Sequence, residues 1–320
     1  MKFRVATQRF TTLIVMLVFI ASTPTTLAKE KGVLGVGVEL GTLVTTEWLA
    51  EHLDDPDLVI LDCTVLVTPG DDGSMQSSSG REAYAQGHIP NAGFADLVND
   101  LSDKESPLDF TMPPVEQFTR TMGLLGVGDT SRVVLYDAHG SVWAARVWWM
   151  LKWAGFDRAA ILDGGLAAWK AEGRVLSTEP AVQTEKLLTA HVRPELIADR
   201  DEVFASIDDD GVMLIDALPE SHYRGEMVMY DWPGHIPGAI NIPSFSLLDE
   251  TGHYLPESEL ELLLGGDRNA RTITYCGGGI AASSNAFILS RLGFTNVAVY
   301  DGSLDEWTDD PKNPMVVDTP

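Results

Sequence analysis

The chain has 320 residues, of which 45% are hydrophobic and 22% charged, and its formal net charge at pH 7 is −25. This composition is typical of a folded globular protein long enough for two domains, and it excludes a disordered chain. With 47 acidic against 22 basic residues, the protein is a poor partner for nucleic acid or anionic membrane surfaces. We interpret the acid excess as a solvating surface.

Residues 1–28 have the three-part layout of a secretory signal peptide. Lys2, Arg4 and Arg9 precede an apolar run over 13–20, and small residues lead to Ala28. Because a bilayer span needs about 20 apolar residues, we expect cleavage rather than a membrane anchor. An uncleaved membrane anchor stays the alternative, since Thr26, at the third position before the predicted cleavage site, is not an ideal residue there. We therefore predict an exported protein, periplasmic or secreted, that is not attached to a membrane after cleavage.

Short apolar strands alternate with helices in the first half of the chain. The sequence predicts a helix over 45–52 with Thr45 at its N-cap, strands over 58–62 and 133–137, and a helix over 142–153. Such alternation implies an α/β fold with a mostly parallel sheet and helices on both of its faces.

The second half of the chain repeats the motifs of the first in the same order. The matched pairs of blocks are 58–62 with 212–216, 87–92 with 234–239, 133–137 with 272–276, 155–156 with 293–294, and 163–169 with 301–307. We therefore predict two tandem domains of one fold, over 44–174 and 196–320. A polar segment over 175–195, which contains two prolines, is predicted to link them.

Cys276 ends a β-branched strand and is followed by Gly277, Gly278 and Gly279 and then by a predicted helix over 280–292. Glycines let backbone N–H groups point inward around one atom, and the start of a helix favours negative charge there. The sequence therefore predicts a reactive cysteine held as a thiolate, for which no metal is needed. The alternative is a buried, inert cysteine at a strand end.

Asp137 stands in the first copy where Cys276 stands in the second. The first domain is thus expected to lack a nucleophile, with Asp137 as a structural remnant. Cys63 is the other cysteine of the chain, and it follows an apolar strand. We interpret it as a packed residue, although an oxidising compartment could join it to Cys276 in a disulfide.

Taken together, these motifs resemble the two-domain rhodaneses, the sulfurtransferase family that includes thiosulfate and 3-mercaptopyruvate sulfurtransferases. The resemblance rests on the tandem repeat, the Gly-His-Ile-Pro-X-Ala block of each half, the Asp-Gly-Gly/Ser…Trp block and the loop 276–281. It covers nearly all of the chain after the signal peptide. It implies two rhodanese-like domains, of which the second is catalytic.

The resemblance implies a double displacement at Cys276. The sulfur would take a sulfane sulfur from thiosulfate or 3-mercaptopyruvate, become a persulfide and pass it to a thiol or cyanide. The N–H groups of Gly277, Gly278, Gly279, Ile280 and Ala281 would bind the persulfide anion, without a cofactor or metal.

The expected partners are a small sulfur donor and a small acceptor, with a thiol protein as a further candidate acceptor and the chain itself a monomer. The alternative is a non-enzymatic persulfide carrier or redox-sensing binding protein, which would not turn over a small acceptor. A phosphatase is disfavoured because Ala281, Ala282 and Ser283 stand where an arginine would close a phosphate cradle.

The donor itself is left open by the sequence. The loop lacks the basic residues of the thiosulfate branch, and Leu218 stands where the mercaptopyruvate branch has an arginine. Arg224 is then the candidate for binding the carboxylate or sulfonate of the donor, or else a surface arginine paired with an acid. The insertion over 225–233, which contains Tyr230, either walls the pocket or packs against the first domain.

Three further residues have no predicted catalytic role. His88 and His235 recur in both halves, including the half without a nucleophile, so we expect them to hold loops by hydrogen bonds. Arg146 belongs to an aromatic helix and is expected near the contact between the domains.

Overall fold

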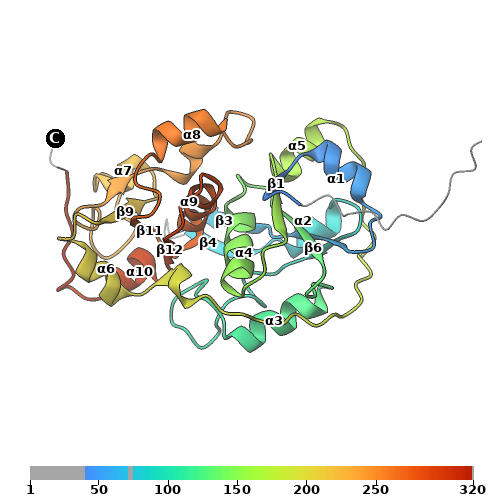
Figure 1. Ribbon diagram of the computed structural model, residues 1–320, viewed down its shortest axis with the longest axis horizontal. Coiled ribbons are helices and arrows are strands. Elements are labelled where there is room, and N and C mark those ends of the chain that lie inside the picture. Colours follow the sequence, from blue (N-terminus) through green and yellow to red (C-terminus); the bar gives the residue numbers. More distant parts are fainter. Residues whose placement is uncertain (1–39, 71–74, 319–320) are drawn as a thin grey trace, which may run out of the picture. The chain divides into compact units, whose positions relative to one another are not determined.

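The computed structural model describes residues 40–70 and 75–318 (Figure 1). The described residues form one compact unit. The predicted signal peptide lies outside the described residues.

The first domain is built on a five-stranded parallel sheet with the strand order β1-β7-β6-β2-β5. Strand residues alternate between its faces, so that α3 and α4 pack on one face and α1 and α5 on the other. The strands are β1 (Leu43–Val44), β2 (Leu58–Asp62), β5 (Ala92–Phe94), β6 (Arg132–Tyr136) and β7 (Ala159–Leu162). The helices are α1 (Thr46–His52), α2 (Arg81–Gln86), α3 (Val115–Leu124), α4 (Val142–Trp153) and α5 (Gly165–Ala171).

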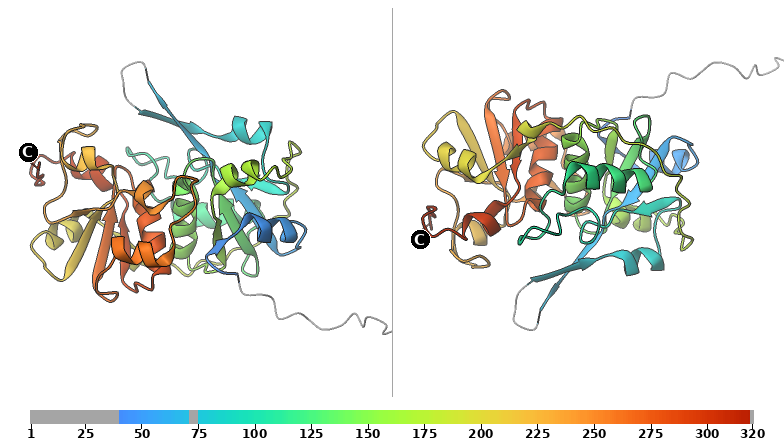
Figure 2. Two further views of the ribbon diagram at one scale, coloured as in Figure 1. Left: turned by 90° about the horizontal axis from the view of Figure 1, so that it is seen from above. Right: turned by 90° about the horizontal axis from the view of Figure 1, so that it is seen from below.

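An antiparallel hairpin interrupts the first domain after β2. It consists of β3 (Val65–Pro69) and β4 (Met75–Ser79), and most of its residues are exposed. Figure 2 shows it projecting from the rest of the domain. The second domain has no counterpart of this hairpin among its described residues.

The second domain repeats the first. Its parallel sheet has the order β10-β9-β11-β12-β8, which is the order of the first sheet read from the other edge. The strands are β8 (Ile197–Ala198), β9 (Val212–Asp216), β10 (Ile240–Asn241), β11 (Arg271–Tyr275) and β12 (Val297–Tyr300). The helices are α6 (Arg200–Ser206), α7 (Glu220–Tyr223), α8 (Glu257–Leu263), α9 (Ile280–Arg291) and α10 (Ser303–Trp307), with the 3-10 turns η1 (Pro194–Leu196) and η2 (Ser244–Leu247). The α/β fold predicted from the repeat is confirmed.

Helices α4 and α9 pack against each other and join the two domains in one hydrophobic cluster. Ten of the twelve residues of α4 are buried, as expected for a helix that is apolar on all sides. The ring of Trp148 meets that of Phe287 edge to face, with 4.9 Å between centroids. Each of these helices begins just after the loop that corresponds to the predicted site of its domain.

The segment over 175–195 runs along the first domain and is tied to it by backbone hydrogen bonds. Ser177 exchanges two with His88, at 2.8 and 2.9 Å, and the N–H of His191 donates to the carbonyl oxygen of Ala154 at 2.8 Å. These backbone hydrogen bonds hold the segment on the surface of the first domain before the second domain begins.

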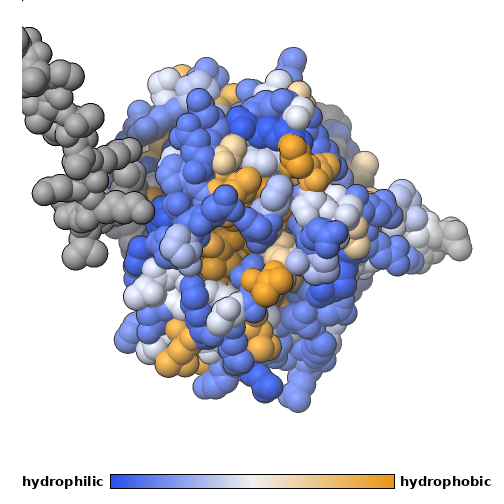
Figure 3. Space-filling view, turned by 90° about the vertical axis from the view of Figure 1, so that its right-hand side faces the viewer, coloured by the Kyte–Doolittle hydropathy of each residue, from blue (hydrophilic) through white to orange (hydrophobic). Residues whose placement is uncertain are grey.

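Hydrophilic residues dominate the face of the molecule in Figure 3, with hydrophobic groups scattered among them. This distribution agrees with an acid-rich solvating surface. Over residues 40–70 and 75–318, no helix has both the length and the hydrophobicity of a membrane span.

Candidate active site

Cys276 lies in a tight loop between β11 and α9, at the carboxyl end of the central strand of the second sheet. Gly279 has a φ of 75°, a left-handed conformation that glycine adopts without strain, and it directly precedes the helix. Ligands of parallel α/β sheets bind at this edge, where strands end and helices begin. The glycines predicted to form a cradle thus lie where such a cradle would be used.

Ser303 fastens this loop from the neighbouring turn. Its hydroxyl oxygen accepts hydrogen bonds from the N–H groups of Cys276 and Gly279, both at 3.1 Å, and donates to the carbonyl oxygen of Tyr300 at 2.7 Å. The N–H of Leu304 donates to the carbonyl oxygen of Cys276 at 3.1 Å. In the sequence, Ser303 stands out only as part of the repeated Asp-Gly-Gly/Ser block. That block did not indicate that Ser303 would hold the loop.

The sulfur of Cys276 is buried, with 2% of the residue exposed. Burial raises the pKa of its thiol, and the negative charge of Asp216 raises it further. Hydrogen bonds from the N–H groups of Ala282, Gly278 and Ala281 act in the opposite direction. Amides therefore face the sulfur, but they differ from the predicted set: Ala282 lies outside it, and the N–H of Gly279 donates to Ser303 instead.

The net shift of the Cys276 pKa is upward, which does not favour the resting thiolate that the sequence predicts. Taking the sulfur anion out of water raises the pKa by more than the hydrogen bonds from the three amides lower it. The site therefore combines a thiol of raised pKa with backbone N–H groups that would stabilise an anion.

The first domain shows an equivalent cradle, in which a carboxyl group takes the place of the sulfur. Asp137 is buried, and its carboxylate accepts hydrogen bonds of 2.7 to 3.0 Å from four backbone N–H groups, those of His139, Ser141, Trp143 and Ala144. Burial raises the pKa of Asp137, and these four groups lower it. Because the side chain of Asp137 itself occupies the cradle, the structure agrees with the interpretation of Asp137 as a structural remnant.

Arg146 extends from helix α4 of the first domain to the loop 276–281 of the second, which we call the catalytic loop. Its side chain is fully buried, and its Nη2 donates to Asp301 of the second domain at 2.5 Å and to the carbonyl oxygen of Phe110 at 2.7 Å. The N–H of Met112 donates to the other oxygen of Asp301 at 2.8 Å. A Cβ added to Gly279 would lie 3.1 Å from Nη1 of Arg146. The non-catalytic domain thus braces the loop that carries the nucleophile.

The insertion over 225–233 walls the site. The hydroxyl of Tyr230 lies so close to Gly277 that any Cβ there would clash with it. Burial raises the pKa of Tyr230, and the nearby charges of Cys276 and Asp305 raise it further. Met229 of the same insertion contacts the Nε2 of His222 through its sulfur at 2.8 Å.

Arg224 is placed at the end of α7, where it forms an ion pair with Glu220, and its side chain is 49% exposed. This pairing corresponds to the alternative raised for a surface arginine in an acidic chain. No hydrogen bond or ion pair joins Arg224 to the loop 276–281 in the described part of the chain, so its role in donor binding stays a prediction.

His88 and His235 hold loops, as predicted. The Nδ1 of His88 bonds to the carbonyl oxygen of Tyr84 at 2.8 Å, and that of His235 bonds to the carbonyl oxygen of Tyr223 at 2.8 Å. Each ring stacks on the tyrosine that it bonds. The equivalence of the two arrangements shows that the motif serves the fold in both copies.

Both cysteines are free thiols, and a disulfide between them is excluded in this structure. Cys63 is fully buried after β2, and burial raises the pKa of its thiol well above the ordinary value. Within 40–70 and 75–318, no cluster of three histidine, cysteine or acidic residues is arranged to hold a metal ion.

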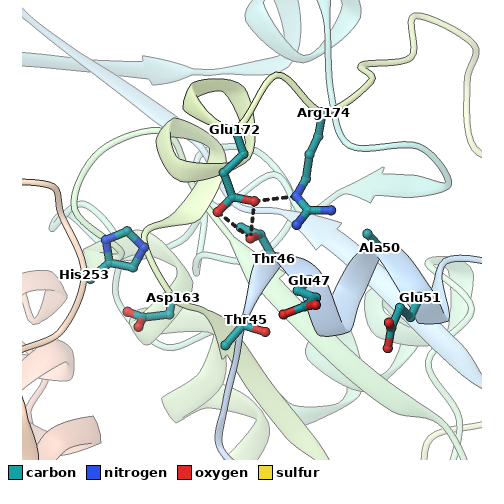
Figure 4. A pocket seen from close by; sticks show the side chains of 9 residues that line it. All are labelled: Thr45, Thr46, Glu47, Ala50, Glu51, Asp163, Glu172, Arg174 and His253. Carbon is teal, nitrogen blue, oxygen red and sulfur yellow. Dashed lines mark hydrogen bonds and ion pairs between the residues drawn. The ribbon is translucent and has the colours of Figure 1, made fainter.

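A cavity of about 560 Å³ lies at α1 and α5 of the first domain, and His253 of the second domain also lines it (Figure 4). In it, Thr46 donates to the carboxylate of Glu172 at 2.7 Å, and Arg174 pairs with the same carboxylate. It contains no residue of the loop 276–281. The chemistry is therefore assigned to the loop that carries Cys276.

Comparison with known proteins identifies this arrangement. A family model for the rhodanese-like domain matches residues 45–172 and again 199–310. The chain belongs to the rhodanese family. The resemblance seen in the sequence motifs is thus confirmed, and both domains of this rhodanese take part in it.

The relatives of this rhodanese are sulfurtransferases. It is 35% identical to a probable 3-mercaptopyruvate sulfurtransferase of Pseudomonas aeruginosa, over 85% of this chain and 97% of the relative. It is 30% identical to thiosulfate sulfurtransferase of Bos taurus, over 83% and 91%. A crystal structure of a 3-mercaptopyruvate sulfurtransferase from Escherichia coli matches with a TM-score of 0.72 and 33% identity, over 82% and 98%. The protein is an enzyme of the thiosulfate or 3-mercaptopyruvate sulfurtransferase type.

Proposed function

We propose that this rhodanese moves a sulfane sulfur through a persulfide at Cys276. In the first half reaction, the sulfur of Cys276 attacks the outer sulfur of thiosulfate, which releases sulfite, or the sulfur of 3-mercaptopyruvate, which releases pyruvate. In the second, a thiol or cyanide attacks the outer persulfide sulfur and restores the cysteine. The electron pair of the broken bond leaves with sulfite, with the pyruvate enolate or with the cysteine sulfur.

The observation that carries this proposal is the pair of equivalent cradles. The carboxylate oxygens of Asp137 lie two bonds beyond Cβ and accept four backbone N–H groups. The outer sulfur of a persulfide at Cys276 would likewise lie two bonds beyond Cβ. An anion at that distance suits inward-pointing amides better than a thiolate one bond closer. The raised pKa of the unloaded thiol agrees with a site built for the loaded enzyme.

Intact-mass measurement after incubation with each donor tests this assignment. The wild type should gain the mass of one sulfur atom and lose it on addition of cyanide. Cys276→Ala should gain none, whereas Cys63→Ala should behave as the wild type. Sulfur transfer by Cys276→Ala at the wild-type rate would refute the proposal. Repeated turnover distinguishes the enzyme from a carrier that exchanges sulfur once.

We further propose that the protein is exported and works as a monomer in the periplasm or outside the cell. The layout of residues 1–28 supports export, and their removal would leave the described domains intact. N-terminal sequencing of the protein from the extracellular or periplasmic fraction should begin near Lys29. Light scattering should give the mass of one chain.

A further inference from the structure

A cavity of about 340 Å³ opens beside the catalytic loop. We call it the entrance cavity; its lining includes Asp109, Met229, Tyr230, Asp231, Asp305 and Asp309. Asp109 comes from the first domain, and the others come from the insertion and from the region of α10 in the second. Its walls are therefore supplied by three separate stretches of the chain.

The entrance cavity adjoins the glycines that follow Cys276. The hydroxyl of Tyr230 lies against Gly277. A Cβ added to Gly278 would lie 3.0 Å from Oδ2 of Asp305 and 3.7 Å from the carbonyl oxygen of Asp109. A donor that approaches the loop from this side passes the carboxylate of Asp305.

Four carboxylates and no basic side chain line this cavity. Neither arginine considered for the site lines the cavity: Arg146 pairs with Asp301 through Nη2, while its Nε and Nη1 have no hydrogen-bond partner among the described residues, and Arg224 pairs with Glu220. An anionic donor thus meets uncompensated negative charge, and the repulsion grows with each charge that the donor carries.

The backbone of Asp305 is tied to the catalytic loop. Its own N–H donates to the carbonyl oxygen of Gly277 at 2.9 Å, which links its backbone to the loop. Burial raises the pKa of its carboxyl to about 6, and the neighbouring charges of Asp109 and Asp309 contribute. At the pH of about 8 chosen for the assay below, this carboxyl is therefore ionised.

We propose that Asp305 is a specificity-determining residue that disfavours dianionic sulfur donors relative to monoanionic ones. This inference rests on the proposed persulfide function and narrows its donor. Thiosulfate carries two negative charges, whereas a 2-oxo acid with a thiol, such as 3-mercaptopyruvate, carries one on its carboxylate. The enzyme is then selective for the mercapto acid, and the carboxylate beside Gly278 is the cause.

The test compares kcat/KM for thiosulfate with kcat/KM for 3-mercaptopyruvate, with cyanide as the acceptor, at pH 8 and low ionic strength. Asp305→Asn removes one charge at nearly constant shape, and it should raise the thiosulfate to mercaptopyruvate ratio about fivefold. Asp109→Asn, at an exposed residue of the same cavity, should raise it by a smaller factor. Asp210→Asn removes the charge of an exposed acid in the turn before β9, and it should leave the ratio unchanged.

Added salt provides a measurement without mutation. Screening should raise the ratio of the wild type toward that of Asp305→Asn. An unchanged ratio in both cavity variants, or an equal rise in Asp210→Asn, would overturn the role of Asp305 while leaving sulfur transfer intact. Absence of persulfide formation from either donor in the wild type would instead overturn the proposed function.

Discussion

The hydroxyl of Ser303 accepts a hydrogen bond from the backbone N–H of Cys276 at 3.1 Å, although 27 positions separate the two residues. The same oxygen accepts from Gly279 at 3.1 Å, so one side chain fixes both ends of the glycine run. The cradle is therefore not a property of the loop alone. It depends on a turn at the end of the next strand of the sheet.

Ser303→Gly tests this dependence. Ser303 has a φ of 48°, which glycine tolerates, so the variant removes the acceptor without backbone strain. Two buried N–H groups lose their partner, and we expect a loss of about 1–3 kcal/mol in the free energy of unfolding, with kcat/KM lower by about tenfold. Urea unfolding and steady-state kinetics measure the two effects. Ser78→Gly, on the exposed hairpin, should change kcat/KM little; unchanged kcat/KM in Ser303→Gly would contradict the role.

The reactivity of Cys276 should rise with pH across the neutral and alkaline range. Burial raises the pKa of the thiol, so the thiolate is the minor form at pH 7 and its fraction grows as pH increases. In Cys63→Ala, where Cys276 is the only thiol, alkylation by iodoacetamide should be slower at pH 7 than for free cysteine. A rate that reaches its plateau below pH 7 would show a thiolate in the resting enzyme.

Asp216→Asn should stabilise the protein at alkaline pH. Burial raises the pKa of Asp216 from 3.8 to about 6, and its Oδ2 has no hydrogen-bond partner. Between these values the folded state keeps a proton that the unfolded state has released, so stability falls as pH rises through this window. About two pKa units correspond to about 3 kcal/mol, the upper limit of the gain at pH 8.

Urea unfolding of the wild type and of Asp216→Asn at pH 3 and at pH 8 checks this prediction. The difference should be small at pH 3, where the carboxyl is protonated in both states. A gain of the same size at both pH values would assign the effect to packing rather than to charge.

Removing one partner of the ion pair between Arg146 and Asp301 should strongly lower the free energy of unfolding. Arg146→Met leaves the carboxylate of Asp301 without its buried counter-charge, which we expect to cost about 3–5 kcal/mol. Arg146→Met with Asp301→Asn should recover part of that loss, because the asparagine oxygen can still accept from Met112. Urea unfolding of both single variants and the double variant gives the coupling. Additive effects would show that the pair does not act as a unit.

Much of the fold could be predicted because its signals are local and occur twice. The helix over 142–153 and the helix after Gly279 begin and end within a residue of the predicted bounds. Thr45 caps α1, as expected, by accepting from the N–H of Trp48 at 3.1 Å. The hairpin of β3 and β4 was not predicted, since its exposed residues show no apolar alternation that indicates a buried strand face.

The candidate site was predicted only in part. The cysteine and its glycines are adjacent in the sequence, and the repeat identified the half that carries the nucleophile. The braces of the loop come from Ser303 and Arg146, and the charge of its entrance comes from Asp109 and Asp305. No spacing rule brings these residues to the loop; the packing of α4 on α9 and the order of the strands do so.

By itself, the amino-acid sequence determined the duplicated α/β architecture, the family and the position of the reactive sulfur, because periodicity, glycine runs and repeated blocks are encoded by neighbouring residues. Only the tertiary structure decided which groups shift the pKa of Cys276 and what charge surrounds it. Both depend on how much water and how many carboxylates are left near one atom. Asp216 and the amides that act on the sulfur come from separate stretches of the second domain, and Asp109 of the first domain reaches the entrance cavity only when the two domains pack together.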